Sequence, residues 1–127
     1  MTTLTDRAAQ VAALIRAVLP AEQIVTHDPA VIDRRGAGPQ GAVLVHPAPD
    51  IDYRAGGVTV YEWTLFVLAR PGRALDALDS IGHTLDALTA AGIGVDRATP
   101  GSYAPTSEQY TDLPGYLLTI TDEHLAL

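Results

Sequence analysis

The 127-residue sequence contains no cysteine and no lysine. Without cysteine, disulfides and thiolate zinc sites are excluded, so the fold depends on packing and hydrogen bonds alone. Long apolar runs are also missing, because the best of them, residues 58–69, is interrupted by Glu62 and falls short of the roughly 20 residues that span a bilayer. The N-terminus lacks the basic and apolar blocks of a secretory signal. These absences predict a protein without a membrane segment that resides in a cytoplasm.

Positive charge is scarce, with 8 basic residues, all arginine, against 15 acidic ones and a net charge of -7. Nucleic-acid-binding proteins gain most of their affinity by neutralising phosphates with Lys and Arg, so this balance argues against a dedicated nucleic-acid binder. An acidic surface can still serve DNA by repelling it. The length fits one domain over residues 1–127, large enough to bury a core.

Two segments have the apolar spacing of amphipathic helices. The first has Thr3 or Thr5 as its N-cap and is ended by Pro20. The second comes after Arg70-Pro71-Gly72 and is closed by Gly92 as a C-cap. The apolar positions expected to face the core are Leu4, Ala8, Val11, Leu14, Ile15, Val18 and Leu19 in the first helix, and Leu75, Leu78, Ile81, Leu85 and Leu88 in the second.

The remaining apolar segments indicate strands, separated by segments rich in turn-forming residues. Strands are expected over residues 23–27, 42–46, 58–69, 95–98 and 116–121, with a turn-like segment at 28–35 and loops at 34–41 and 99–114. This order predicts an α+β fold, a mainly antiparallel four- to five-stranded sheet with two helices packed on one face. The loop 99–114 is longer than ordinary connections, and we interpret it as an interaction arm.

The strand at residues 58–69 is apolar on both of its sides. One side carries Val58, Val60, Phe66 and Leu68, and the other carries Tyr61, Trp63, Leu65 and Val67. Such a pattern is typical of a strand covered on both faces. Two helices can cover one face but leave little chain for the other, so we expect a partner chain there.

Several motifs with chemical potential are weakened by their context. Gly36, Gly38 and Gly41 match G-x-G-x-x-G, but they precede a strand instead of opening a helix, so we expect a flexible loop without phosphate. Asp50 and Asp52 are spaced like a D-x-D cation motif but lack the other ligands, which favours a solvated turn.

The histidines do not indicate a metal site, and the one group of serine, histidine and aspartate does not indicate a catalytic site. His27, His46, His83 and His124 lie in separate elements, without the spacing of a zinc helix. Asp79, Ser80 and His83 lie on one helix without a nucleophile elbow. We therefore expect no catalytic residue, no metal and no cofactor.

Surface positions offer better candidates for function. Tyr103, Tyr110 and Tyr116 cluster in and after the long loop, and tyrosine is enriched where proteins meet. Tyr61 and Trp63 fit a core or an interface equally well. Further candidates are the exposed arginines Arg34 and Arg35, and a possible acidic stripe of Asp76, Asp79 and Asp86 on the second helix.

Four stretches together are similar to one family: residues 58–68 (VTVYEWTLFVL), the turn 70–73 (RPGR), the helix 74–81 (ALDALDSI) and residues 114–120 (PGYLLTI). They resemble tail terminator proteins of long-tailed, siphovirus-type phages, particularly those of actinobacteria. The resemblance implies a homohexameric ring in the neck of the virion that caps the tail tube and joins the tail to the head connector or stopper protein. DNA would pass through an acidic lumen without specific binding.

Two other functions are open at this point. Another neck or tail completion protein of a phage would share nearly every feature. A small α+β ligand-binding or enzyme domain would use the two-sided strand to line a pocket and the histidines to act on substrate.

Overall fold

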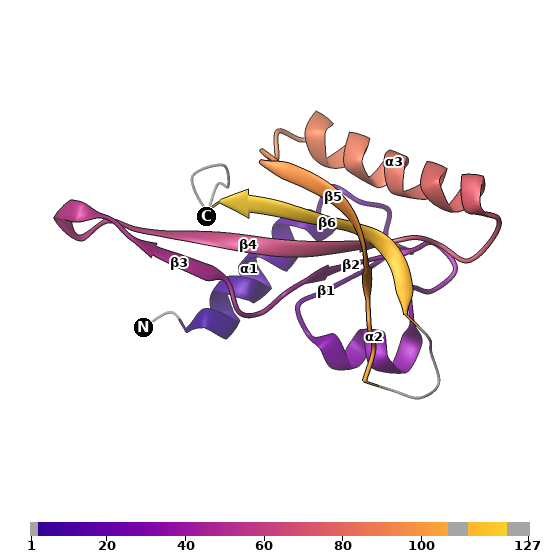
Figure 1. Ribbon diagram of the computed structural model, residues 1–127, viewed down its shortest axis with the longest axis horizontal. Helices are drawn as coiled ribbons and strands as arrows, with labels where there is room; N and C mark the ends of the chain where they lie inside the picture. The colour runs from indigo at the N-terminus through magenta and orange to yellow at the C-terminus, as the bar shows by residue number, and fades with distance from the viewer. Residues whose placement is uncertain (1–2, 107–111, 122–127) are drawn as a thin grey trace.

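The computed structural model describes residues 3–106 and 112–121, in which three α-helices pack around one six-stranded sheet (Figure 1). A 3-10 turn at Ala55–Gly57 lies between β3 and β4. The elements are α1 (Leu4–Arg16), β1 (Ile24–Thr26), α2 (Pro29–Arg35), β2 (Ala42–Val45), β3 (Asp50–Tyr53), β4 (Thr59–Leu68), α3 (Ala74–Ala90), β5 (Arg97–Tyr103) and β6 (Leu113–Thr121).

The described strands form one mixed sheet in the order β1-β2-β4-β6-β5, and β3 pairs with the outer half of β4. All neighbours are antiparallel except β1 and β2, which are parallel. The expected α+β class is confirmed. The expected four- to five-stranded sheet is wrong in detail, because the sheet has six strands and one parallel pair.

Helix α1 begins where the sequence predicts. The hydroxyl of Thr3 accepts a hydrogen bond from the amide of Asp6 at 3.0 Å, and the carboxylate of Asp6 accepts one from the amide of Thr3 at 3.2 Å. This capping box satisfies two amides that the first turn would leave unpaired. The helix buries Ala8, Val11, Ala12 and Ile15 against the sheet.

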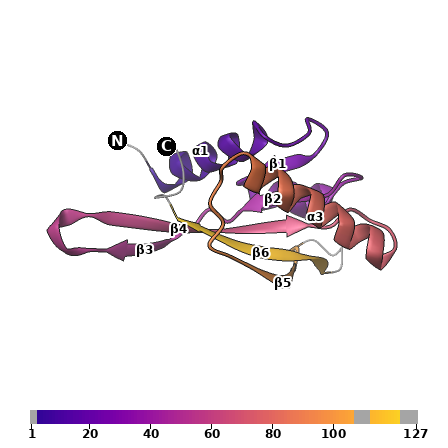
Figure 2. The ribbon, with the colours of Figure 1, turned by 90° about the horizontal axis from the view of Figure 1, so that it is seen from above.

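Helices α1 and α3 cover the same face of the sheet, as expected for two helices (Figure 2). Their buried residues join Trp63, Leu65 and Val67 of β4 in the main core. A third helix, α2, covers one end of the opposite face, where Ile32 packs against Leu44 and Leu68. The arrangement with helices on only one face is therefore wrong.

Helix α2 replaces the turn expected over residues 28–35. Asp28-Pro29 looks like a helix breaker in the sequence, but Asp28 is the N-cap and its carboxylate accepts a hydrogen bond from Ala30 at 3.0 Å. Proline is favoured in the first turn because it has no amide that needs a partner there. The same two residues therefore start a helix.

The D-x-D segment is a strand, so the expected solvated turn is wrong. In β3, Asp50 and Asp52 alternate with Ile51 and Tyr53 and pair with residues 59–62 of β4. The hairpin of residues 50–62, here called the arm, projects from the body at the left of Figure 1. It has no helix over it at its tip in either ribbon view (Figure 2).

Strand β5 occupies much of the segment expected to be a loop. It runs over Arg97–Tyr103 and pairs with β6, which leaves residues 104–112 as the connection. Residues 107–111 of that connection lie outside the described residues. Pro100 and Gly101 suggested a loop, but β5 is an edge strand, and edge strands tolerate proline.

Candidate interaction surfaces

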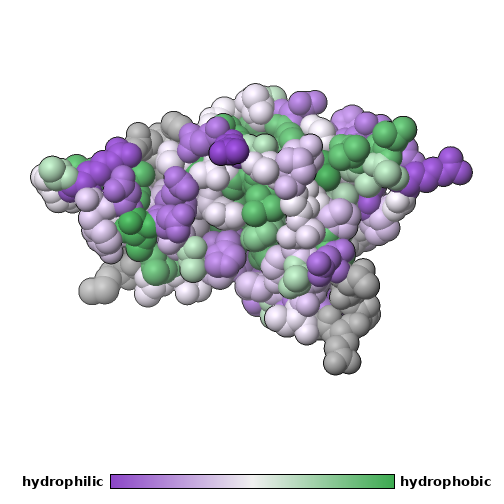
Figure 3. Space-filling model, viewed as in Figure 1, coloured by the Kyte–Doolittle hydropathy of each residue, from purple (hydrophilic) through white to green (hydrophobic). Residues whose placement is uncertain are grey.

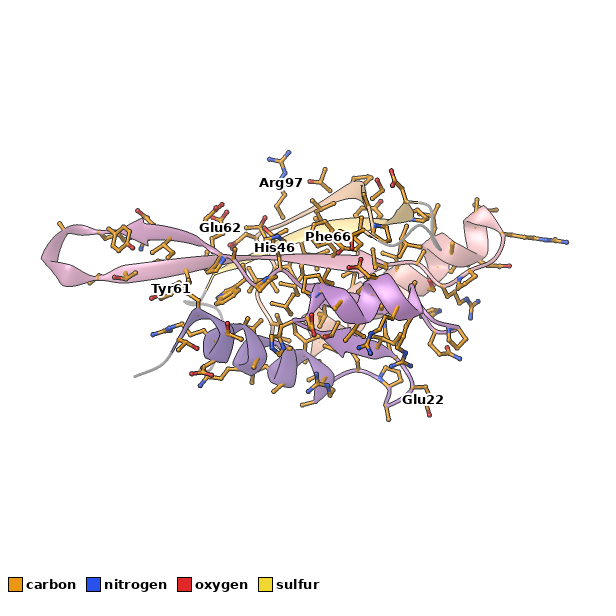
Figure 4. The ribbon with its side chains drawn as sticks, turned by 90° about the horizontal axis from the view of Figure 1, so that it is seen from below. Glu22, His46, Tyr61, Glu62, Phe66 and Arg97 are labelled. Atoms are coloured by element: carbon orange, nitrogen blue, oxygen red, sulfur yellow. The ribbon has the colours of Figure 1, made fainter. Side chains whose placement is uncertain are left out.

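The tryptophan of β4 lies inside the protomer. Trp63 has no exposed surface and packs in the main core, so it offers no contact area to a partner. The half-buried ring of Tyr61 stacks on Trp63 with ring centroids 6.3 Å apart. The guanidinium of Arg7 lies 4.5 Å from the centroid of the Tyr61 ring. Figure 4 shows Tyr61 at the base of the arm.

The opposite face of β4 is only partly covered. Leu68 is buried beneath α2, whereas Phe66 is half-buried and meets the ring of Tyr103 edge-on at 5.3 Å between centroids. Farther along this face Thr64 is half-buried and Glu62 is exposed (Figure 4). The face is therefore apolar beneath α2, polar at Thr64 and Glu62, and apolar again at the buried Val60, so it does not need a partner along its whole length.

The three tyrosines expected to cluster do not form one site. Tyr103 lies on the α2 side of the sheet, and Tyr116 lies on the other side, half-buried against the main core. Burial, and secondarily the nearby carboxylate of Asp33, raises the pKa of Tyr103. Asp33 also accepts hydrogen bonds from the amide of Thr106 at 3.0 Å and from its hydroxyl at 2.7 Å. Tyr110 lies outside the described residues.

The two arginines of α2 are exposed at the end of the helix. The guanidinium of Arg34 donates a hydrogen bond to the carbonyl of Ala30 at 3.3 Å, one turn earlier. Arg35 is the next residue, so the helix presents two adjacent cations. Their position is accessible to a neighbouring chain.

The glycine motif after α2 serves a tight connection. Gly36, Gly38 and Gly41 all have positive φ. A side chain at Gly41 would overlap the carbonyl oxygen of Leu68, so the backbones of this segment and of β4 approach too closely for any other residue. The motif leads into β2 and opens no helix.

Helix α3 carries an exposed apolar pair that the periodicity placed in the core. Leu75 is 75% exposed and Leu78 is 51% exposed, so the expectation for these two leucines is wrong. The reason is visible in Figure 1, where the first turns of α3 extend past the ends of the strands. Apolar atoms show at the same place at the right of Figure 3.

The acidic positions of α3 flank these leucines. Asp76, Asp79 and Asp86 are all exposed. Leu78, Asp79, Gly82, His83 and Asp86 line a shallow hollow of about 350 Å³. An open surface with apolar side chains among carboxylates is suited to a partner that offers both apolar contacts and a cation.

The arm carries the other strongly exposed apolar pair. Tyr53 is 78% exposed and Val58 is 52% exposed. Between them in the hairpin, the guanidinium of Arg54 lies 3.1 Å from the carboxylate of Asp52, with both side chains at least half exposed. Sequence reasoning missed this surface because Asp50 and Asp52 suggested a turn.

A smaller hollow of about 200 Å³ lies between the end of α1 and α3, lined by Leu19, Gln23, Ser80, His83 and Thr84 among others. The amide of Gln23 donates a buried hydrogen bond to the hydroxyl of Thr84 at 3.0 Å. The hydroxyl of Ser80 donates to the carbonyl of Ala77 at 2.7 Å. Ser80 thus bonds the backbone of its own helix, and its hydroxyl also accepts from the amide of Arg70 at 3.3 Å.

The residues that could bind a metal or act in catalysis are dispersed over the fold. His27, His46 and His83 lie in different parts of the fold, and His124 lies outside the described residues. Within residues 3–106 and 112–121, no group of three His, Asp or Glu side chains is placed to hold a metal ion. The same residues include no helix with the length and apolarity needed to cross a membrane.

Comparison with known proteins places the chain in no family. No family model matches it, and no curated protein and no solved structure matches it either.

Proposed function

We propose that this chain is a structural virion protein, a tail terminator of a long-tailed phage that acts by shape and surface complementarity and not by catalysis. Copies would form a homohexameric ring in the neck of the virion, assembled in the host cytoplasm. The ring would cap the tail tube protein and join the tail to the head connector or stopper protein.

The observation that carries this proposal is the pairing of a projecting arm with strongly exposed apolar side chains. Tyr53 on the arm and Leu75 on α3 are each at least 75% exposed. Exposed apolar side chains that occur in pairs on one element, Tyr53 with Val58 and Leu75 with Leu78, are candidates for burial by a partner. A subunit whose exposed apolar groups lie on separate elements is suited to repeated assembly with copies of itself.

Charge and resemblance support the same function. The net charge of -7 suits a ring through which DNA passes without binding, since an acidic lumen repels phosphates. The stretches that resemble tail terminators form β4, the start of α3 and β6, which lie together in the fold. Asp76, Asp79 and Asp86 are exposed and are available to line such a lumen.

Electron microscopy of the purified protein tests this function. Negatively stained images should show rings with a central hole, and addition of the protein to growing tail tubes should stop their elongation at one end. Particles of single-subunit size, together with unchanged tube lengths, would contradict the proposal.

A ligand-binding domain is the second candidate, and the hollow between α1 and α3 is the observation that favours it. However, its volume of about 200 Å³ is smaller than the roughly 300–1,000 Å³ of ordinary small-molecule pockets, which makes this the weaker candidate. A screen of metabolites by thermal unfolding decides between the two, because a ligand that binds only the folded state raises the melting temperature.

A further inference from the structure

The most exposed large apolar side chains among the described residues fall into two pairs. Tyr53 and Val58 belong to the arm, and Leu75 and Leu78 belong to α3, and each of the four is more than half exposed. Leu4 and Val18 are less exposed, at 43% and 36%. The two pairs lie at opposite ends of the long axis of the protomer (Figure 1). One contact between two copies could therefore bury all four side chains.

The α3 surface offers a shallow hollow beside its exposed leucines. Its hollow of about 350 Å³ has Gly82 in its lining, and a Cβ at Gly82 would meet no atom within 4 Å. Leu78 supplies an apolar wall, and Asp79 and Asp86 supply two carboxylates. His83 also lines the hollow, so an occupant that suits it offers apolar side chains to Leu78 and a positive charge to the carboxylates.

The arm tip has these properties. It is a two-stranded hairpin, and Arg54 lies between Tyr53 and Val58, with the amide of Arg54 donating to the carbonyl of Val58 at 2.8 Å. The guanidinium of Arg54 forms an ion pair with Asp52, and both side chains are at least half exposed. Exposed ion pairs contribute little to stability, so Arg54 can also approach new carboxylates at little cost.

We propose that the arm tip of one copy docks on α3 of the next copy, with Tyr53 and Val58 against Leu75 and Leu78, and Arg54 beside Asp79 and Asp86. The inference rests on the proposed ring function and names the contact that builds the ring. A contact between two different patches is heterologous, and it closes into a ring when the rotation between copies permits. Asp79 and Asp86 then belong to the subunit contact, which leaves Asp76 for the lumen.

Cysteine cross-linking tests the contact on a clean background, because the natural chain has no cysteine. Two variants, Tyr53→Cys and Leu78→Cys, are oxidised separately and as an equal mixture at high protein concentration. The mixture should form at least ten times more disulfide-linked dimer than either variant alone. The matched control mixture, Leu4→Cys with Leu78→Cys, should stay at the level of the single variants.

A complementation experiment tests whether the contact is directional. Val58→Asp damages the arm tip, and Leu78→Asp damages the α3 surface, so each variant alone should fail to assemble. An equal mixture retains one intact arm and one intact α3 surface per pair, so it should form dimers and nothing larger. Leu4→Ser and Val18→Ser change the other exposed apolar side chains and should assemble like the natural chain.

The outcomes separate this inference from the function on which it rests. If the natural chain forms oligomers but both damaged variants do so equally well, the docking is wrong while the ring function stands. The docking is also wrong if Tyr53→Cys cross-links to the tail tube protein and not to Leu78→Cys. If the natural chain is monomeric and the mixture gives no cross-link, both proposals are overturned.

Discussion

Asp50 and Glu62 lie directly opposite each other in the β3–β4 ladder, so that two carboxylates share one face of the arm. They line a hollow of about 300 Å³ together with Asp52 and Arg54. Like charges in directly opposite positions destabilise a sheet. The base of the arm is therefore weaker than its backbone hydrogen bonds alone would make it.

Removing one of the two charges should stabilise the protein. Glu62→Gln is expected to raise the free energy of unfolding by about 0.2–1 kcal/mol, and Glu62→Lys by at least as much. Urea unfolding at low ionic strength measures the gain, which should shrink in 1 M salt because salt screens the repulsion. Glu22→Gln, at another exposed glutamate (Figure 4), is the control and should change little. A loss of stability in Glu62→Gln would contradict the account of the arm.

Because of Tyr103, we expect the folded protein to lose stability at high pH. Burial, followed by the charge of Asp33, raises its pKa in the folded protein, so the neutral phenol is favoured there. The stability that this shift contributes is fully present below the unfolded pKa, near 10, and is lost as the pH rises through the folded value.

Unfolding at pH 8 and pH 11 checks this dependence. The natural chain should lose more stability between the two pH values than Tyr103→Phe does. Asp33→Asn should reduce the difference without abolishing it, because burial is the larger cause. Identical losses in the natural chain and in Tyr103→Phe would refute the assignment.

The buried hydrogen bond between Gln23 and Thr84 joins the segment after α1 to α3. Thr84→Val removes the acceptor and leaves a buried amide without it, which should cost about 1–3 kcal/mol of unfolding free energy. Thr89→Val is the matched control. Both threonine hydroxyls donate to a carbonyl one turn earlier in α3, but Thr89 is exposed. Thermal unfolding of both variants measures the difference, and equal losses would show that the Gln23 contact is unimportant.

Two glycines should respond in opposite directions to alanine. A Cβ at Gly115 would overlap the carbonyl oxygen of Val67, a backbone atom that cannot move aside, so Gly115→Ala should lose about 3 kcal/mol or more. Gly82 lies in the middle of α3 with open space around it, so Gly82→Ala should gain about 0.5–1 kcal/mol. Denaturant titrations compare the two, and a well-folded Gly115→Ala would mean that β4 and β6 are less tightly apposed.

The periodic segments of the chain were predictable from sequence, and the segments on the edges of the sheet were not. The spacing of apolar residues places α1 and β4 correctly, and Thr3 marks the first helix start. Pro100 and Asp50 suggested loops because proline and aspartate disfavour strands, but edge strands and a projecting arm expose enough backbone to tolerate them. Asp28-Pro29 can break one helix or cap the next, and only the packing of Ile32 on the sheet decides in favour of the cap.

Which residues of a helix or strand are exposed depends on the elements that pack against it, and the sequence does not show which elements these are. The spacing of Leu75 and Leu78 identifies one stripe of α3 but not how far the helix extends past the sheet. The apolar surroundings of Trp63 fit a core and an interface equally, and only the packing of both long helices on the sheet decides between them. The arm surface was missed because Asp50 and Asp52 suggested a turn, and their pairing with β4 shows only in the fold.

The molecular mass in solution tests the central claim that copies of this chain assemble with one another. Light scattering across a wide range of protein concentrations should show one dominant species of about six times 13.4 kDa, which is about 80 kDa. A mass of 13.4 kDa that does not change up to the highest concentration would contradict it.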